Sequence, residues 1–301
     1  MKRTTLTFAV ATLLLASCGS DSKSTPTTAA ATTAAPGTTA APASTAPSAT
    51  DCAKGHTIAA DVLTIATGNP AYPPYVIDDK PESGQGFEAA LALAVAKDMG
   101  FEGAAVKWVR TDFDSAVAGT ADTFDFNLQQ FTINADREKV VSFSTPYYTA
   151  NQAVLGYATG AGASVKSLAD LKKLKLGAAA GTTSLQFITD IIKPDVEPFA
   201  FNSNADAKTA LDNKQIDAIV TDLPTALYIS AVEISGTKVF GQIPASAGGA
   251  GDSWGLLFKK DNPLAECANL ALADLTTSGD LGKITQQWMA DYTEAPELGV
   301  G

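Results

Sequence analysis

The chain after residue 50 is predicted to adopt an α/β fold with a mostly parallel sheet. Short runs rich in β-branched residues alternate there with stretches whose apolar side chains recur at helical spacing. The chain has 301 residues. Without its atypical N-terminus, about 250 remain, which suits two ordinary domains.

The first series of elements begins with a strand over residues 62–67. Phe87, Leu91, Val95 and Met99 then recur every four residues, which predicts a helix over 87–99 ending at Gly100. Further strands of this series are expected at residues 106–109, 124–128, 140–143 and 152–157.

A second series follows with the same alternation. Its expected strands span residues 175–179 and 216–221, and its helices span 184–192 and 205–213. The last segment is expected to hold a strand at 255–258 and helices at 263–276 and 281–289.

The N-terminus is typical of an exported lipoprotein. Lys2 and Arg3 precede an apolar run over residues 6–16 that is too short to cross a bilayer. Leu15-Ala16-Ser17-Cys18 resembles the bacterial lipobox. We expect residues 1–17 to be a cleaved signal peptide and Cys18 to be lipidated, which would anchor the protein to the outer face of the cytoplasmic membrane. The alternative is ordinary secretion with loss of Cys18.

Residues 18–50 are predicted to form a disordered tether behind this anchor. From residue 21 they consist mainly of Ala, Thr, Pro and Ser and contain no aromatic or large aliphatic side chain. Such a segment cannot bury enough apolar area to fold.

Charge and composition exclude several functions. The formal net charge of -11 provides no basic surface for phosphates, so we expect no nucleic-acid partner. One histidine and three cysteines argue against a zinc site, and we expect no metal and no cofactor. Membrane contact is expected through the lipid anchor only.

Several motifs together resemble the family 3 extracellular solute-binding proteins, the amino-acid receptors of ABC importers. The resemblance covers residues 60–292 in the same order and at similar spacing. The motifs are Ala71-Tyr72-Pro73-Pro74-Tyr75, Gly86-Phe87-Glu88, residues 132–137, residues 143–148, residues 167–171, Gly181-Thr182-Thr183-Ser184 and residues 217–222.

The resemblance implies a two-lobed periplasmic-binding-protein fold of type II. In this fold two open mixed β-sheets, flanked by helices, are joined by two hinge crossovers, here expected at residues 147–151 and 242–247. Lobe one would comprise residues 51–148 and 247–295, lobe two residues 149–246 including the hinges, and 296–301 a C-terminal tail. We expect a monomer.

Arg137 is the first candidate for holding an amino acid. A guanidinium group is always charged and its planar fork matches a carboxylate. Arg137 also follows a predicted strand, where open α/β sheets present ligand groups. A surface ion pair with Asp136 or Glu138 is the alternative. The resemblance places Arg137 at the family's carboxylate-binding arginine.

The opposite charge is expected from Asp222. It ends a predicted strand and matches the family's ammonium-binding aspartate, although a turn before Pro224 would also use Asp. By the same resemblance, Thr132 and the Gln130 carbonyl complete the ammonium site.

Two further groups complete the expected site. The backbones of Thr182 and Thr183 precede a predicted helix, where unpaired N–H groups can bind a carboxylate; capping by a threonine hydroxyl is a compatible alternative. Tyr72 and Phe113 match aromatic walls around the ligand, with ordinary core packing as the alternative.

The specificity region departs from the family pattern. Asn69, Ala179 and Thr221 stand where relatives carry residues that read the ligand side chain, so with Gln130 they predict an uncharged lining. An unmatched ligand charge would be costly there, which predicts a neutral amino acid. Strand alternation argues against both Gln129 and Gln130 facing the ligand.

Cys52 and Cys267 remain after lipidation of Cys18. The family fold returns the Cys267 helix to lobe one, so a disulfide with Cys52 is expected, and two free thiols are the alternative.

The expected function is a binding protein that closes on an amino acid and delivers it to an ABC permease and, indirectly, its ATPase. Two alternatives stay open. One is an enzyme on the same fold that resembles cyclohexadienyl dehydratase; it needs a protonatable acid in an apolar cleft. The other is a ligand-sensing receptor subunit.

Overall fold

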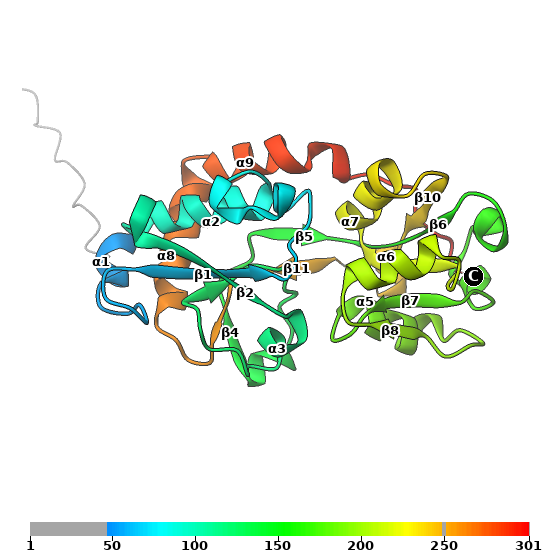
Figure 1. Ribbon diagram of the computed structural model, residues 1–301, viewed down its shortest axis with the longest axis horizontal. Helices are drawn as coiled ribbons and strands as arrows, with labels where there is room; N and C mark the ends of the chain where they lie inside the picture. Colours follow the sequence, from blue (N-terminus) through cyan, green and yellow to red (C-terminus); the bar gives the residue numbers. More distant parts are fainter. Residues whose placement is uncertain (1–46, 249–250, 301) are drawn as a thin grey trace, which may run out of the picture. The chain divides into compact units, whose positions relative to one another are not determined.

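The computed structural model describes residues 47–248 and 251–300. The predicted signal peptide, Cys18 and the tether up to residue 46 lie outside the described residues. Within them the chain forms two five-stranded sheets, each with its own helices, which we call lobe one and lobe two (Figure 1).

Lobe one is built on a mixed sheet in which β1 is parallel to β2 and β3, while β12 is antiparallel to β3 and β4. All six residues of β1 are buried, as expected for a central strand covered on both faces. The sheet order is β2 (Val106–Thr111), β1 (Leu63–Gly68), β3 (Phe126–Asn127), β12 (Leu257–Lys259), β4 (Val141–Phe143).

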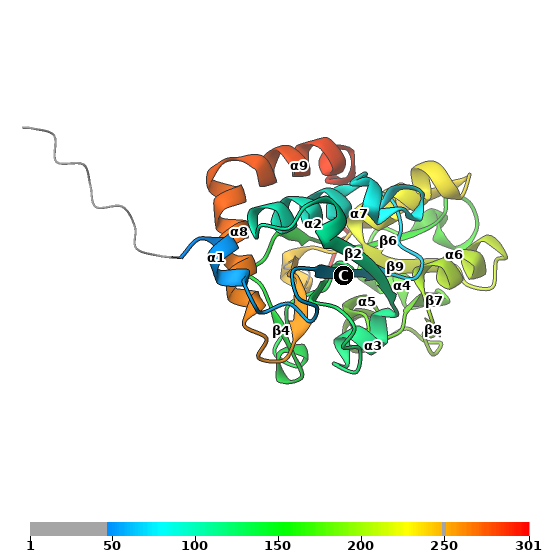
Figure 2. The ribbon, with the colours of Figure 1, turned by 60° about the vertical axis from the view of Figure 1, so that its left-hand side comes forward.

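Helices cover both faces of this sheet. Ile65 packs in the cluster that includes α2 (Phe87–Asp98), α8 (Leu264–Thr277) and α9 (Asp280–Met289) (Figure 2). The next residue, Ala66, packs with α3 (Phe113–Val117) in a separate cluster. Side chains alternate along a strand, so consecutive residues of β1 contribute to two different cores.

Lobe two repeats the architecture with a second mixed sheet. β7 is parallel to β8 and β9, and β6 is antiparallel to β9 and β10. The order is β10 (Thr237–Gln242), β6 (Gln152–Tyr157), β9 (Ala218–Asp222), β7 (Leu176–Ala179), β8 (Phe199–Phe201). Its helices are α4 (Leu168–Leu171), α5 (Thr183–Phe187), α6 (Asn204–Asp212) and α7 (Leu223–Tyr228). The two open mixed sheets confirm the fold class that the resemblance implied. The mostly parallel sheet expected from the alternation of elements is not found, because two of the four strand pairs in each sheet are antiparallel.

Two strands join the lobes as an antiparallel ribbon. β5 (Tyr148–Ala150) leads from lobe one into β6, and β11 (Asp252–Trp254) leads back toward β12. The exact lobe boundaries expected from the sequence stay a prediction.

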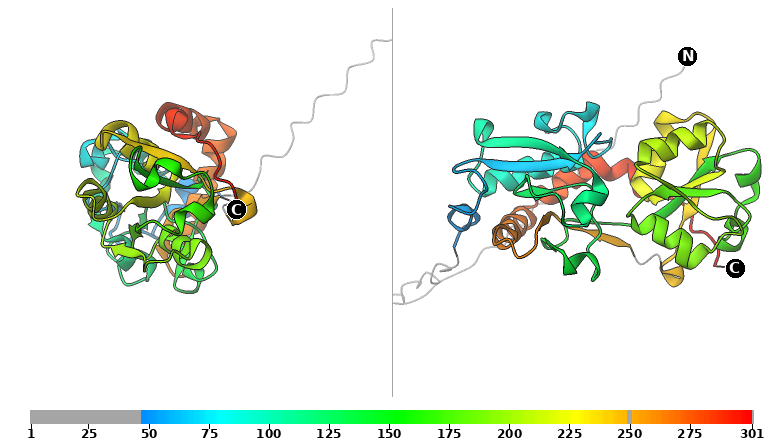
Figure 3. Two further views of the ribbon diagram at one scale, coloured as in Figure 1. Left: turned by 90° about the vertical axis from the view of Figure 1, so that its right-hand side faces the viewer. Right: turned by 60° about the horizontal axis from the view of Figure 1, so that its bottom comes forward.

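The C-terminal residues 295–300 make a third crossing, which the sequence did not indicate. After α9 the chain runs to lobe two, where Gln242 exchanges backbone hydrogen bonds with Pro296 and Leu298, and Leu298 is buried (Figure 3). We call residues 295–300 the C-terminal strap.

Helix α1 (Ala49–Ala53) begins within the segment that we expected to be a disordered tether. Ser48 caps it, Ala49 is buried, and the Thr50 hydroxyl donates to the Asp98 carbonyl at 2.8 Å. Residues 48–50 therefore belong to lobe one. Their composition matches the rest of the tether, and only contacts with α2 and α8 distinguish them.

A disulfide joins Cys52 of α1 to Cys267 of α8, with the two Cα atoms 5.3 Å apart. This is the expected pair. No helix within residues 47–248 and 251–300 is both long and apolar enough to span a membrane.

Several short elements were not predicted from the sequence: α3, α4, α7, β5, β8, β10 and β11. All have three to six residues, too few for a hydrophobic period to emerge. The helix expected at 184–192 is α5 followed by a π-helical turn, Ile188–Ile192.

Candidate functional site

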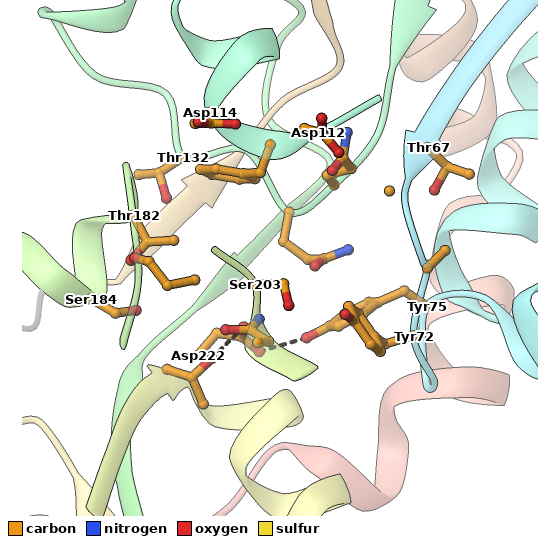
Figure 4. Close-up of a pocket in the computed structure, with 18 of the residues that line it drawn as sticks. Thr67, Tyr72, Tyr75, Asp112, Asp114, Thr132, Thr182, Ser184, Ser203 and Asp222 are labelled. Carbon is orange, nitrogen blue, oxygen red and sulfur yellow. Dashed lines mark hydrogen bonds between the residues drawn. The ribbon is translucent and has the colours of Figure 1, made fainter. Parts of the chain in front are cut away.

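A cavity of about 490 Å³ lies between the carboxyl ends of strands from both sheets (Figure 4). Segments that follow β1, β2 and β3 line it from lobe one. Segments that follow β7 and β8, together with the last two residues of β9, line it from lobe two. All eleven predicted ligand residues lie on its wall: Asn69, Tyr72, Phe113, Gln130, Thr132, Arg137, Ala179, Thr182, Thr183, Thr221 and Asp222.

Arg137 provides a buried positive charge at one end of the cavity. Its guanidinium donates to the carbonyls of Thr132 at 2.8 Å and of Gly181 in lobe two at 3.0 Å. The side chain is 8% exposed, and burial lowers its pKa to about 10. Within the described residues no acid forms a salt bridge with it, so neither expected surface ion pair forms. The guanidinium is therefore a buried cation without an anion in contact.

The turn before α5 supplies neutral donors close to this charge. The Thr182 hydroxyl accepts from the Leu185 N–H at 3.2 Å, so the capping alternative is realised. The N–H groups of Thr182 and Thr183 find no acceptor in the described part of the chain. Thr132 of lobe one reaches Thr183 of lobe two, with 3.5 Å between their hydroxyl oxygens. An anion at Arg137 would thus meet unpaired N–H groups as well.

Asp222 provides the complementary charge, from lobe two. Its carboxylate accepts from the Tyr75 hydroxyl of lobe one at 2.5 Å, a bond drawn in Figure 4, and from the Thr225 N–H at 2.9 Å. It therefore also caps α7, the turn role that the sequence left open. Burial raises the pKa of Asp222, and no cation pairs with it within the described ranges.

The aromatic walls differ in their partners. Phe113 stacks on Phe131 with ring centroids 5.1 Å apart, and the Arg137 guanidinium carbon lies 5.4 Å from its centroid. The buried Tyr72 hydroxyl has no hydrogen-bond partner among the described residues. Phe113 thus combines a packing role with a cation–π contact, while Tyr72 presents an unused polar atom.

The cavity is lined by more acidic residues than we expected from the sequence, which predicted only uncharged groups besides Arg137 and Asp222. The wall also contains Glu88, Asp112, Asp114, Asp206 and Asp252. Asp112, Asp114 and Asp206 are exposed at the rim. Asp252 accepts from Thr183 and Gln152, and it lies on β11, a strand that the sequence did not predict.

Both Gln129 and Gln130 line the cavity, which corrects the argument from strand alternation. β3 ends at Asn127, so the following residues are not held to an extended geometry. Gln130 has a φ of 50°, in the left-handed region, and this turn brings consecutive side chains to the same wall.

Glu88 was missed, although it belongs to the Gly86-Phe87-Glu88 motif. It is 2% exposed and accepts hydrogen bonds from Gln130 and from the Tyr147 hydroxyl. Burial raises its pKa to about 7. The sequence analysis named it only as part of this motif and assigned it no role. No cluster of metal-ligating side chains occurs in the part of the chain that the structure covers.

Comparison with known proteins identifies the family. The description "Bacterial extracellular solute-binding proteins, family 3" matches residues 63–291. ABC transporter arginine-binding protein 1 of Escherichia coli is 28% identical, over 72% of this chain and 86% of its own length. The glutamine-binding protein GlnH of Bacillus subtilis is 31% identical, over 70% of this chain and 76% of its own.

Solved structures agree with this assignment. An ancestral arginine-binding protein bound to glutamine is 32% identical with a TM-score of 0.65, covering 76% of this chain and 97% of that one. The ancestral amino acid-binding protein AncCDT-1, a precursor of cyclohexadienyl dehydratase, is 30% identical with a TM-score of 0.63, covering 76% and 95%. The chain therefore belongs to the bacterial extracellular solute-binding proteins of family 3.

Proposed function

We propose that this protein captures a free amino acid between its lobes and delivers it to the permease of an ABC importer. One observation carries the proposal: the buried Arg137 and the half-buried Asp222, on opposite lobes, form no salt bridge in the described residues and line one cavity. An α-amino acid offers the missing anion and the missing cation on one carbon atom.

The ligand would complete contacts from both lobes. Its carboxylate would bind Arg137 and the unpaired N–H groups of Thr182 and Thr183. Its ammonium group would bind Asp222 and the Gln130 carbonyl, and its stem would lie between Tyr72 and Phe113. Ligand binding then favours the closed arrangement, since each lobe supplies part of the site.

We infer that the side chain of the ligand is cationic rather than neutral. The lining residues foreseen from the sequence, Asn69, Ala179 and Thr221, are uncharged, but six acids and one arginine line the whole cavity. An acidic wall repels a carboxylate side chain and attracts a cation. The relatives named above as arginine-binding proteins agree with this choice.

Calorimetry on residues 47–301 with the twenty amino acids tests this proposal. L-Arginine should bind more tightly than L-glutamine, and L-glutamate should not bind. If L-glutamine binds more tightly and the D112N/D114N/D206N variant leaves its affinity unchanged, the neutral ligand predicted from the sequence is correct.

Replacing Arg137 with Ala should weaken binding at least about a hundredfold, because removing one partner of a buried charge pair costs several kcal/mol. Lys139→Ala is the matched control: it removes an exposed cation two residues away and should leave the affinity unchanged. Unaltered affinity in R137A would remove Arg137 from the site.

The N-terminal segment supports a proposal on location. We propose that residues 1–17 direct export and that Cys18 anchors the protein by a lipid to the outer face of the cytoplasmic membrane. Cys18→Ser should move the protein from the membrane fraction to the soluble fraction. Retention in the membrane fraction would contradict the anchor.

A dehydratase is the second candidate, because the cavity contains the protonatable acid that this chemistry needs. Glu88 has a pKa of about 7. Both of its oxygens are held by Gln130 and Tyr147, which favours a positioning role instead. Product formation from prephenate-type acids would establish the enzyme. A sensing role would use the same site, and neighbouring permease genes would argue against it.

A further inference from the structure

Glu88 occupies a defined place beside the cavity, as the second residue of α2. The backbone N–H groups of Glu88 and Ala89 both donate to the Tyr75 carbonyl, at 3.0 and 3.2 Å. Gly86 makes this approach possible, since a Cβ there would lie 2.4 Å from the Tyr75 oxygen. The helix start is therefore fixed against the Tyr75 segment, whose hydroxyl reaches Asp222.

The Glu88 carboxylate holds Gln130 at two points. It accepts from the Gln130 backbone N–H at 2.8 Å and from the Gln130 side-chain amide at 2.5 Å. Gln130 has a φ of 50°, a conformation that costs a residue with a side chain about 1 kcal/mol or more. The two hydrogen bonds offset this cost and hold Gln130 in this conformation from its backbone N–H and its side chain. The direction of the Gln130 carbonyl, which belongs to the following peptide group, depends on this conformation.

The Gln130 carbonyl is left available by this arrangement. No donor within residues 47–248 and 251–300 forms a hydrogen bond with it. The N–H group of Gln130 donates to Glu88, and Gln130 itself lines the cavity. A ligand ammonium group is the donor that would satisfy the free carbonyl.

Within residues 47–248 and 251–300 the Glu88 carboxylate forms no salt bridge. Its polar neighbours are Gln130, Tyr147, which comes just before the β5 hinge strand, and the Asp222 carboxylate across the cavity. Tyr75 and Tyr147 are neutral at physiological pH, since burial and these two acids raise the pKa of both hydroxyls. Glu88 and Asp222 thus provide two carboxyl groups, and neither forms a salt bridge in the part of the chain that the structure describes.

We propose that Glu88 is a positioning residue for the ligand's ammonium group, because it holds the Gln130 carbonyl for that group and adds a second negative charge beside Asp222. This inference rests on the proposed amino-acid site and names a member of it that does not contact the ligand. Its carboxyl group must be ionised to act, so ligand affinity is coupled to its protonation.

The coupling has a definite sign. Burial and the Asp222 charge raise the pKa of Glu88 to about 7 in the free protein. A bound ammonium group favours the ionised form and lowers this pKa, so binding below neutral pH releases a proton. The Kd should therefore rise up to about tenfold between pH 8 and pH 6.

The test measures the Kd of L-arginine and of L-glutamine by calorimetry from pH 6 to pH 8, in wild type, E88Q and the control E82Q, whose altered residue is exposed. E88Q should bind with a Kd that no longer depends on pH and that resembles the wild-type value at pH 6. E82Q should retain the wild-type slope. Thermal unfolding identifies any variant that does not fold. In that case the proposal is tested by the number of protons that wild type releases on binding, measured by calorimetry in buffers of different ionisation enthalpy.

Each outcome has a distinct meaning. A wild-type Kd that is constant over this pH range, or an E88Q variant that keeps the slope, overturns the role of Glu88 and leaves the amino-acid site intact. A wild-type protein that binds no amino acid overturns the proposed function and this inference with it.

Discussion

Glu88 is buried and Asp222 is half-buried, and in both positions loss of hydration disfavours the ionised carboxyl group. Burial raises both pKa values, that of Glu88 to about 7. The two carboxyl groups favour binding, because a ligand cation that enters the empty site is stabilised by negative charge that no salt bridge of the described residues neutralises. The ligand-free protein is expected to be less stable at neutral pH than at mildly acidic pH for this reason.

Stability should depend on pH through Glu88. Because the folded pKa lies above the unfolded value of about 4.3, the stabilisation is complete below about pH 4 and is lost as the pH rises through 7. The free energy of unfolding of the ligand-free protein should increase by about 2 kcal/mol from pH 7.5 to pH 5.5. Urea unfolding at both pH values measures it, and an E88Q variant with the same increase would contradict the assignment.

The site was predictable where a residue combined a charge with the end of a strand. Arg137 and Asp222 were proposed in this way, and Thr182 and Thr183 from the unpaired N–H groups that precede a helix. The family resemblance decided between the alternatives. Glu88 and Asp252 were not found. Their position depends on a helix start packed against a loop and on a strand of three residues, neither of which leaves a local pattern.

At the scale of elements, the long periodic segments agreed with the structure, and the elements that the sequence analysis missed are all short. The helix expected at 87–99 is α2, because its apolar side chains repeat over three turns. β8 and β10 lie at the edges of their sheet. β8 has no buried residue, and only two of the six residues of β10 are buried. Edge strands need no continuous apolar run, so composition does not indicate them.

Helix α1 is an element that tertiary contacts stabilise, since five residues do not form a helix alone. Its disulfide to α8 spans 215 residues of sequence. Removing it as C52A/C267A should lower the free energy of unfolding by up to about 4 to 5 kcal/mol on a chain-entropy estimate. Denaturant unfolding with and without reductant measures the loss. Wild type that is insensitive to reductant would contradict a stabilising role.

At the scale of the whole chain, the C-terminal strap gives the lobes a third connection beside β5 and β11. It extends past residue 291, where the family match ends. Backbone hydrogen bonds from residues 296–299 to Gln242, Lys166 and Leu168 fix it to lobe two. The strap therefore restrains how lobe two can move relative to α9.

Leu298 tests the strap. It is 3% exposed in the core of lobe two, so Leu298→Ala should reduce stability by about 2 to 5 kcal/mol. Val300→Ala is the matched control, since Val300 is 60% exposed and should change stability little. Equal unfolding midpoints for the two variants would show that the strap is not held by this side chain.

The disulfide between α1 and α8 also fixes which lobe the N-terminal segment is attached to, and with the proposed lipid anchor that lobe would be the one held at the membrane. Residues before 47 join the described chain at α1, and α1 is covalently bonded to lobe one at both Cys52 and its own backbone. If Cys18 is held at a membrane, any pull along the chain acts on lobe one and bypasses the ribbon of β5 and β11. Lobe two would then be the half that swings, and opening the site would require no displacement of the anchored half.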